Sequence, residues 1–248
     1  MIVLRSDEEI GSIRRAGQIV ASTLAKLKRF ARAGIETKEL DAIAREEILK
    51  ENGYPAFKDY KGFPGNICIS LNEVVVHGIP SARRIKSGDI ISIDIGVKFK
   101  DYFADAAITI GVGQISPEAG RLIEATEKAL YAGVANARPG NRLYDISSAI
   151  QNIAESNGFS VVRSFVGHGI GLRLHEEPEI PNFGKQGSGP RLEKGMVLAI
   201  EPMVNTGTYE VEILADGWTA VTKDRKLSAH FEHTIAIRDG DAEILTEL

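Results

Sequence analysis

The segment Lys86-Ser87-Gly88-Asp89-Ile90-Ile91-Ser92-Ile93-Asp94 has a near-copy in Glu193-Lys194-Gly195-Met196-Val197-Leu198-Ala199-Ile200-Glu201, 107 positions further along the chain. Each copy places a glycine before an apolar run and ends in a carboxylate. Residues 104–110 and 231–237 form a second matching pair, again with an acid at the equivalent position. Burying an unpaired carboxylate is very costly. Four acids placed by an internal repeat therefore predict a cation, most simply a metal ion, between two related halves.

The composition is that of an enzyme-sized globular protein. The chain has 248 residues, 43% of them hydrophobic, and the repeat favours a single catalytic domain, 1–248, with halves at roughly 6–110 and 116–237. A net charge of −4 gives no reason to expect nucleic acid or an anionic membrane as a partner. Cys68 is the only cysteine, which excludes an internal disulfide and favours the reducing cytoplasm. We expect neither a secretion signal, nor a membrane span, nor an N-terminal extension.

Capping residues and glycines divide each half into two helices followed by strands. Residues 6–9, Ser-Asp-Glu-Glu, form a capping box that predicts a helix start, and Thr37 is a candidate cap for the next helix. In the second half, Ser116-Pro117 opens the equivalent helix with proline at its first position. Glycine-containing breaks are expected to end the four helices, at 33–34, 52–53, 139–140 and 157–158.

Residues 90–99 and 102–110 predict a hairpin that turns near Phe99-Lys100. In that register Asp94 and Asp105 lie directly opposite each other, with Cβ atoms ~5 Å apart on one face of the sheet. Like charges held in this way repel each other unless a cation lies between them.

The second half predicts the same arrangement from strands at 196–204 and 230–237, which bring Glu201 and Glu232 together across a longer connection. We therefore expect an α+β fold in which a curved antiparallel sheet lines the site and the helices cover its outer face.

Three of the five histidines lie in suggestive motifs, with His77 in segment 72–80 and with His168 and His175 in segment 167–178. Glycines on both sides of His168 allow close backbone approach and favour a ligand over a packing residue. One imidazole with four carboxylates is typical of a site for a hard or borderline divalent ion, and not of a structural zinc site, which is rich in thiolates. Since five ligands are too many for one catalytic ion with an open position, the set predicts two ions about 3.5–4 Å apart.

With these motifs the chain resembles the type I methionine aminopeptidases, which have the pita-bread fold with pseudo-twofold duplicated halves. The resemblance covers essentially the whole chain and rests on segments 72–80, 92–96, 167–178, 199–203 and 230–234. It implies five metal ligands: Asp94, Asp105, His168, Glu201 and Glu232. Asp105 and Glu232 would bridge two ions, Asp94 would complete one site, and His168 with Glu201 would complete the other. Mn, Fe(II) and Co are the expected metals, and Zn also fits.

The resemblance also implies the reaction, which is removal of the N-terminal methionine from nascent proteins whose second residue is small. A hydroxide bridging the two ions would attack the first peptide bond. Glu201 would shuttle a proton, His175 would hydrogen-bond the scissile carbonyl, and His77 would contact the peptide beyond that bond.

The pocket for the first side chain would be lined by Tyr60, Phe63, Cys68, Leu174 and Trp218. Aromatic groups and sulfur suit an unbranched thioether, and Cys68 would then be a packing residue and not a nucleophile. Phe57 and Leu174 depart from residues common among the relatives, which leaves the shape of the pocket open.

Two alternatives remain at the level of sequence. X-Pro aminopeptidases of the same fold share the five-ligand pattern but usually carry an N-terminal domain. A non-catalytic peptide-binding relative would be expected to have lost ligands. Type II methionine aminopeptidases carry a long insertion between the last two ligands, whereas 30 residues separate Glu201 from Glu232 here. We expect a monomer that associates transiently with the ribosome, with no nucleic acid substrate.

Overall fold

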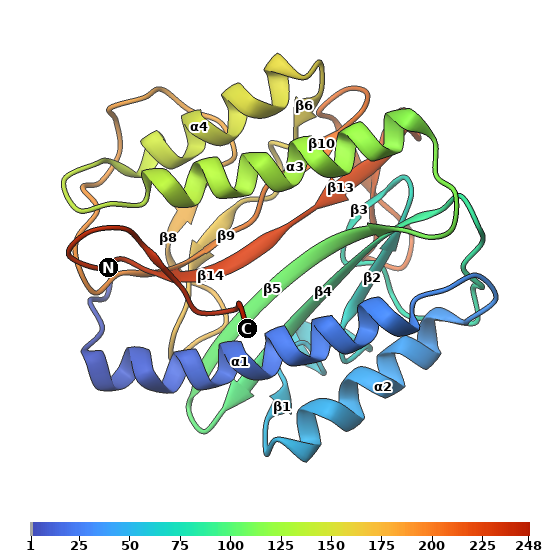
Figure 1. Ribbon diagram of the computed structural model, residues 1–248, viewed down its shortest axis with the longest axis horizontal. Coiled ribbons are helices and arrows are strands. Elements are labelled where there is room, and N and C mark those ends of the chain that lie inside the picture. Colours follow the sequence, from blue (N-terminus) through green and yellow to red (C-terminus); the bar gives the residue numbers. More distant parts are fainter. Residues whose placement is uncertain (1) are drawn as a thin grey trace.

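Four helices cover one face of a curved antiparallel sheet in the computed structural model, which describes residues 2–248 (Figure 1). The helices are α1 (Asp7–Phe30), α2 (Thr37–Lys50), α3 (Pro117–Asn136) and α4 (Leu143–Ser156), and a 3-10 turn, η1, spans Tyr60–Gly62. Helices α1 and α2 lie over one half of the sheet and α3 and α4 over the other (Figure 1). Within residues 2–248, no helix combines the length and apolar character needed to cross a membrane.

The main sheet has nine strands, and every pairing in it is antiparallel. Its path runs β1-β4-β5-β14-β9-β7-β8, with β2 added beside β4 and β15 beside β14. Two three-stranded sheets, β13-β10-β6 and β11-β12-β3, complete the structure. The strands are β1 (Tyr54–Pro55), β2 (Cys68–Leu71), β3 (Val74–Val76), β4 (Ile90–Phe99), β5 (Tyr102–Gly111), β6 (Ser160–Val161), β7 (Gly167–Gly169), β8 (Glu176–Ile180), β9 (Val197–Ile200), β10 (Met203–Asn205), β11 (Val211–Ile213), β12 (Ala220–Thr222), β13 (Ser228–His230), β14 (Glu232–Ala236) and β15 (Glu243–Ile244).

The helix starts expected from capping residues are confirmed, with one correction. Ser6 forms the capping box of α1 with Glu9, and the Ser116 hydroxyl accepts the Ala119 N–H at 3.1 Å ahead of Pro117. The prediction that Thr37 caps α2 is wrong, because Glu36 occupies the cap and Thr37 is the first helical residue. The Thr37 hydroxyl instead donates to the carbonyl of Ser81 at 3.0 Å. A tertiary contact therefore competes successfully for this hydroxyl.

The two halves repeat each other in backbone detail. An isolated bridge joins Glu36 to Arg84 in the first half, and another joins Arg142 to Arg191 in the second, so that each ties the entry of a helix to the entry of a strand. Gly88 and Gly195, which precede the two copied strands, have φ values of 97° and 94°. Residues with a Cβ rarely adopt a backbone conformation with positive φ, which explains why both copies of the motif have glycine at this position.

The register predicted for the first hairpin is wrong by two residues. The turn is centred on Lys100-Asp101, with Phe99 paired to Tyr102, so Asp94 faces Ala107 and Asp105 faces Gly96. Lys100 adopts a left-handed backbone with φ of 54°, as a tight two-residue turn requires. The two aspartates still share one face, since they differ from direct opposition by two positions.

The second half departs from the prediction in a different way. The strand expected at 196–204 is interrupted, because Glu201 and Pro202 lie between β9 and β10, and Phe231 similarly separates β13 from β14. The pairings on either side, His233 with Ile200 and His230 with Met203, keep one register across the gap. That register leaves Glu201 facing Glu232, as the sequence predicted.

Two apolar cores lie between helices and sheet. The first joins α1 and α2 to β2, β4 and β5, and the second joins α3 and α4 to β9 and β14. Each helix pair thus buries its apolar face against its own half of the sheet, which leaves the opposite, concave face free to carry polar groups.

Candidate active site

A cavity of about 280 Å³ opens on the face of the sheet opposite the helices. All of the residues expected at the site line it: Tyr60, Phe63, Cys68, His77, Asp94, Asp105, His168, Leu174, His175, Glu201, Trp218 and Glu232. They come from both halves of the chain, with acids at one end and aromatic and aliphatic groups around them. The folded chain therefore brings together every residue that the sequence singled out.

The acids are positioned by one row of residues across the sheet. Asp94 on β4 pairs with Ala107 on β5, and Ala107 pairs in turn with Glu232 on β14. Directly paired residues point to the same face, so the row continues from Glu232 to Glu201. Ala107 contributes only a methyl group at the middle of this row. It leaves space between the carboxylates where a larger side chain would fill it.

Asp105 and His168 complete the cluster. Asp105 lies two residues before Ala107 on the same face of β5, and His168 lies on β7 next to β9. Ligand atoms of Asp105, His168 and Glu232 all lie within 4.8 Å of one another. The His168 Nε2 atom is 3.6 Å from an oxygen of Asp105 and 3.6 Å from one of Glu201.

Burial and mutual repulsion dominate the electrostatics of the acids. The pKa values of Asp94, Glu201 and Glu232 are held well above their ordinary values, first by burial and then by the neighbouring carboxylates. Burial also raises the pKa of Asp105, although His168 and the Thr234 hydroxyl oppose that rise. Like charges packed out of water disfavour the ionised form.

This donor set fits divalent metal ions. Within residues 2–248, no lysine or arginine forms an ion pair with any of the four acids. The Oδ1 atom of Asp94 is buried without a hydrogen-bond partner. In the part of the chain that the structure describes, no cationic side chain balances the charge of these acids. Four carboxylates and one imidazole form a ligand set that suits hard or borderline divalent cations.

His175 and His77 line the same cavity as the acids. The Nδ1 atom of His175 lies 2.8 Å from the Tyr60 hydroxyl oxygen, and its ring centroid is 4.3 Å from that of His168. The ring of His77 meets Phe165 edge-on at 5.4 Å. Burial lowers the pKa of His77 to about 4. Desolvation of the ring inside the cavity, and then the charge of His168, lower the pKa of His175 to about 3, although the residue as a whole remains exposed. Both imidazoles are therefore neutral near pH 7.

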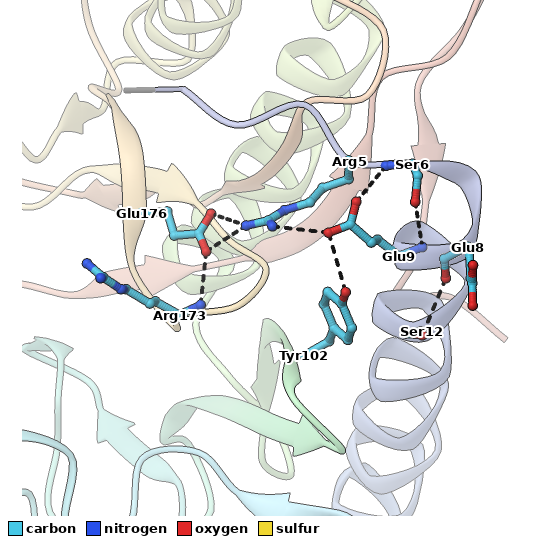
Figure 2. A network of polar contacts seen from close by, with 8 residues as sticks. All are labelled: Arg5, Ser6, Glu8, Glu9, Ser12, Tyr102, Arg173 and Glu176. Atoms are coloured by element: carbon cyan, nitrogen blue, oxygen red, sulfur yellow. Dashed lines mark hydrogen bonds and ion pairs between the residues drawn. The ribbon is translucent and has the colours of Figure 1, made fainter.

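The loop that carries His175 is tied to the N-terminal segment by a partly buried ion pair (Figure 2). The Arg5 guanidinium donates to both carboxylate oxygens of Glu176, at 2.6 and 2.8 Å, and contacts Glu9 at 3.4 Å. Glu176 also accepts the backbone N–H of Arg173 at 2.9 Å. Gly171 faces the guanidinium so closely that a Cβ there would collide with it. The residue next to His175 is thus anchored on both sides.

Phe63 and Trp218 form part of the apolar lining of the cavity, and their rings meet edge-on with centroids 5.2 Å apart. Leu174 and Cys68 are buried beside them, with 2% and 4% of their surface exposed. Burial, and then the charge of Asp94, raise the pKa of the Cys68 thiol well above its usual value. A thiol held protonated in this way is a packing group and a poor nucleophile.

Sequence reasoning missed two groups that touch the acids. The Nε2 atom of His230, a residue only 2% exposed, lies 3.7 Å from Glu201 and has no hydrogen-bond partner. The Thr234 hydroxyl lies 2.9 Å from Oδ1 of Asp105 and accepts the Asp105 N–H. Side chains alternate between the two faces of a strand, so Thr234 must lie on the same face of β14 as Glu232, and the threonine could have been predicted on this ground. The same spacing applied to the strand expected at 230–237 also puts His230 on the face of Glu232, so the histidine could have been found in the same way.

Comparison with known proteins agrees with this geometry. Residues 11–239 match the model of metallopeptidase family M24. The chain is 55% identical to a methionine aminopeptidase of Clostridium perfringens, over 99% of both chains. A crystal structure of methionine aminopeptidase from Thermotoga maritima superposes with a TM-score of 0.99 and 42% identity over the full length of both chains. A prolidase of Pyrococcus furiosus shares the fold alone, with a TM-score of 0.78, 23% identity and 66% of its length covered. The chain belongs to metallopeptidase family M24.

Proposed function

We propose that this protein is a metal-dependent methionine aminopeptidase that removes the N-terminal methionine from nascent proteins whose second residue is small. One observation carries the proposal, which is that three buried acids, the partly buried Glu201 and one histidine line the same cavity as a set of aromatic and aliphatic side chains. The cluster suits hydrolysis of a peptide bond, and the pocket suits an unbranched apolar side chain next to that bond. The high identity to methionine aminopeptidases over the full length supports this reading over the X-Pro alternative.

Two divalent ions per chain are part of the proposal. Asp94, Asp105, His168, Glu201 and Glu232 would hold them, and Mn, Fe(II) or Co suit the set best, with Zn also accepted. When bound, such ions lower the pKa of a coordinated water and polarise a carbonyl. They would also offset the repulsion that holds the carboxylate pKa values high. The whole of 1–248 would act as one catalytic domain.

Glu201 is the proposed proton carrier. Its side chain is 13% exposed, against 3% for Asp105, so it reaches the cavity more openly. It lies where β9 has ended, and its carbonyl accepts the Asn182 side-chain amide at 3.0 Å instead of a ladder partner. A carboxylate within reach of the attacking water can take a proton from it and return that proton to the leaving amine.

The two neutral histidines would handle the substrate peptide. His175 lies beside the acid cluster, where its N–H can donate to the oxygen of the scissile carbonyl as negative charge develops there. His77 lies across the cavity against Phe165 and Trp218, where it can contact the peptide beyond the scissile bond. Tyr60, Phe63, Cys68, Leu174 and Trp218 would select the methionine side chain by shape and by contact with its sulfur.

Hydrolysis assays test the proposal. Protein purified without oxygen, stripped of metal and then loaded with Mn(II), Fe(II), Co(II) or Zn(II), should release methionine from Met-Ala-Ser and leave Ala-Pro peptides intact. Absence of methionine release with every metal would refute the proposal. Preferential cleavage of the Ala-Pro bond would establish the X-Pro activity instead.

Three further measurements test the finer points. Calorimetric titration of metal-free protein should resolve two ions per chain. Size-exclusion chromatography with light scattering should give a monomer. Co-sedimentation with ribosomes that carry nascent chains should detect the transient association.

A further inference from the structure

Tyr60 is presented to the cavity by an unusual stretch of backbone. The residues on either side of it, Asp59 and Lys61, have φ values of 62° and 49°, and Gly62 follows with 89°. Non-glycine residues pay about 1 kcal/mol or more for a left-handed conformation. Two of them flanking one side chain indicate that the fold specifies where that side chain lies.

The tyrosine hydroxyl reaches a single ring nitrogen. It lies 2.8 Å from Nδ1 of His175, and the two rings stack at 5.2 Å with an angle of 28° between their planes. A neutral imidazole carries one ring proton. That proton lies either on Nδ1 or on Nε2, and the partner at Nδ1 decides between them.

Hydrogen-bond chemistry favours tyrosine as the donor. A phenol is a better donor, and a poorer acceptor, than the unprotonated nitrogen of an imidazole. The ammonium of Lys61 lies 5.3 Å from the centre of the Tyr60 ring, and a nearby cation makes the phenol a still better donor. Nε2 is the remaining nitrogen of a side chain that lines the same cavity as the acids, and a proton there is free to be donated to a bound substrate.

We propose that Tyr60 is a positioning residue that donates its hydroxyl proton to Nδ1 of His175 and thereby fixes the tautomer with the proton on Nε2. In this tautomer His175 can donate to the scissile carbonyl. In the other tautomer it would present a lone pair to an oxygen and would oppose the reaction. The assignment rests on the proposed function for its catalytic consequence, and it gives Tyr60 a role beyond lining the methionine pocket.

The tautomer is measured directly by two-bond ¹H–¹⁵N correlation on ¹⁵N-labelled protein, metal-free and again with diamagnetic Zn(II). His175→Gln identifies the His175 signals by their loss. The wild-type protein should show an unprotonated Nδ1 and a protonated Nε2, and Tyr60→Phe, which keeps the ring, should lose this preference. Tyr54→Phe, the same change on an exposed tyrosine outside the cavity, should leave the spectrum unchanged.

Kinetics on Met-Ala-Ser supply the second readout. Removing one oxyanion donor costs about 10²–10³ in kcat, so a donor present only part of the time should cost less, about tenfold, with KM within about twofold. A wild-type His175 protonated on Nδ1 would overturn the proposal, as would a Tyr60→Phe variant with unchanged tautomer or unchanged kcat. If the wild-type enzyme released no methionine, the proposed function would fail while the tautomer measurement still stood.

Discussion

The two copied strands hold their acids in different ways. In the first half, β4 and β5 run for ten residues each, and both Asp94 and Asp105 lie inside an unbroken ladder. In the second half, β9 ends at Ile200, and Glu201 with Pro202 stands outside any strand. A residue inside a ladder has its backbone held on both sides, whereas one at a break is held less. The duplicated scaffold thus provides rigid carboxylates in one half and a freer one in the other, and only the freer one is proposed to carry a proton.

Exchanging the equivalent acids for amides gives the largest expected effect. Glu201→Gln should lower kcat for Met-Ala-Ser by about 10³-fold, since general acid–base catalysis contributes about 10²–10⁴, while peptide binding is retained. Asp94→Asn should act chiefly by weakening metal binding. Steady-state kinetics beside metal titration separate the two. A Glu201→Gln enzyme with near-normal kcat would mean that the second half has no special role.

Breaking the link between the halves should have the next largest effect. Arg5→Ala leaves the partly buried Glu176 without its partner, and removing one member of a fully buried pair costs about 3–5 kcal/mol. We expect the free energy of unfolding, measured with urea, to fall by about 3 kcal/mol. This is the low end of the range, because 14% of the Glu176 side chain is exposed to solvent. Arg14→Ala, which breaks the more exposed pair with Glu243, should cost below about 1 kcal/mol. Equal losses of unfolding free energy in the two variants would show that the Arg5–Glu176 pair stabilises the fold no more than the exposed Arg14–Glu243 pair does.

The pH dependence of the metal-free protein should distinguish the rigid acid from the freer one. A carboxyl whose pKa is raised on folding stabilises the fold below its unfolded pKa of about 3.9 and loses that contribution as pH rises through the folded value. Metal-free Asp94→Asn should therefore match the wild type near pH 4 and exceed it by roughly 1 kcal/mol or more at pH 8.

The same substitution in the second half is the matched comparison. Glu201→Gln should gain less than Asp94→Asn, because Glu201 is closer to solvent. Urea unfolding in the presence of chelator at several pH values measures both. A loss of stability at pH 8 in either variant would show that its charge is compensated in the metal-free fold.

The smallest effect is expected at the strand break itself. Pro202 cannot donate to a ladder, but His230, Phe231 and Met203 keep their pairings around it. Pro202→Ala should therefore cost only about 0.4–1 kcal/mol, through greater freedom of the unfolded chain, and kcat should stay within about twofold. A large fall in kcat would show that proline, and not the surrounding pairing, keeps Glu201 out of the ladder.

Particular residues show how far the sequence could be read. Ser6 and Ser116 act locally, so the helix starts that they predict are found. Thr37 fails as a cap because Ser81, 44 positions away, competes for its hydroxyl. The predicted register of the first hairpin is wrong by two residues, because moving the centre of the turn by one position shifts every pair by two. Such a shift leaves each side chain on the same face, so the alternation of residues does not distinguish the two turns.

The sequence by itself determined the duplication, the helix-helix-strand order of each half and the identity of the acids, because these follow from repeated motifs and local periodicity. The tertiary structure decided which residues face one another. It placed Ala107 between Asp94 and Glu232, set His230 beside Glu201 and joined Tyr60 to Nδ1 of His175. Such contacts join residues far apart along the chain, and packing and strand pairing of the whole molecule, not local propensity, select them.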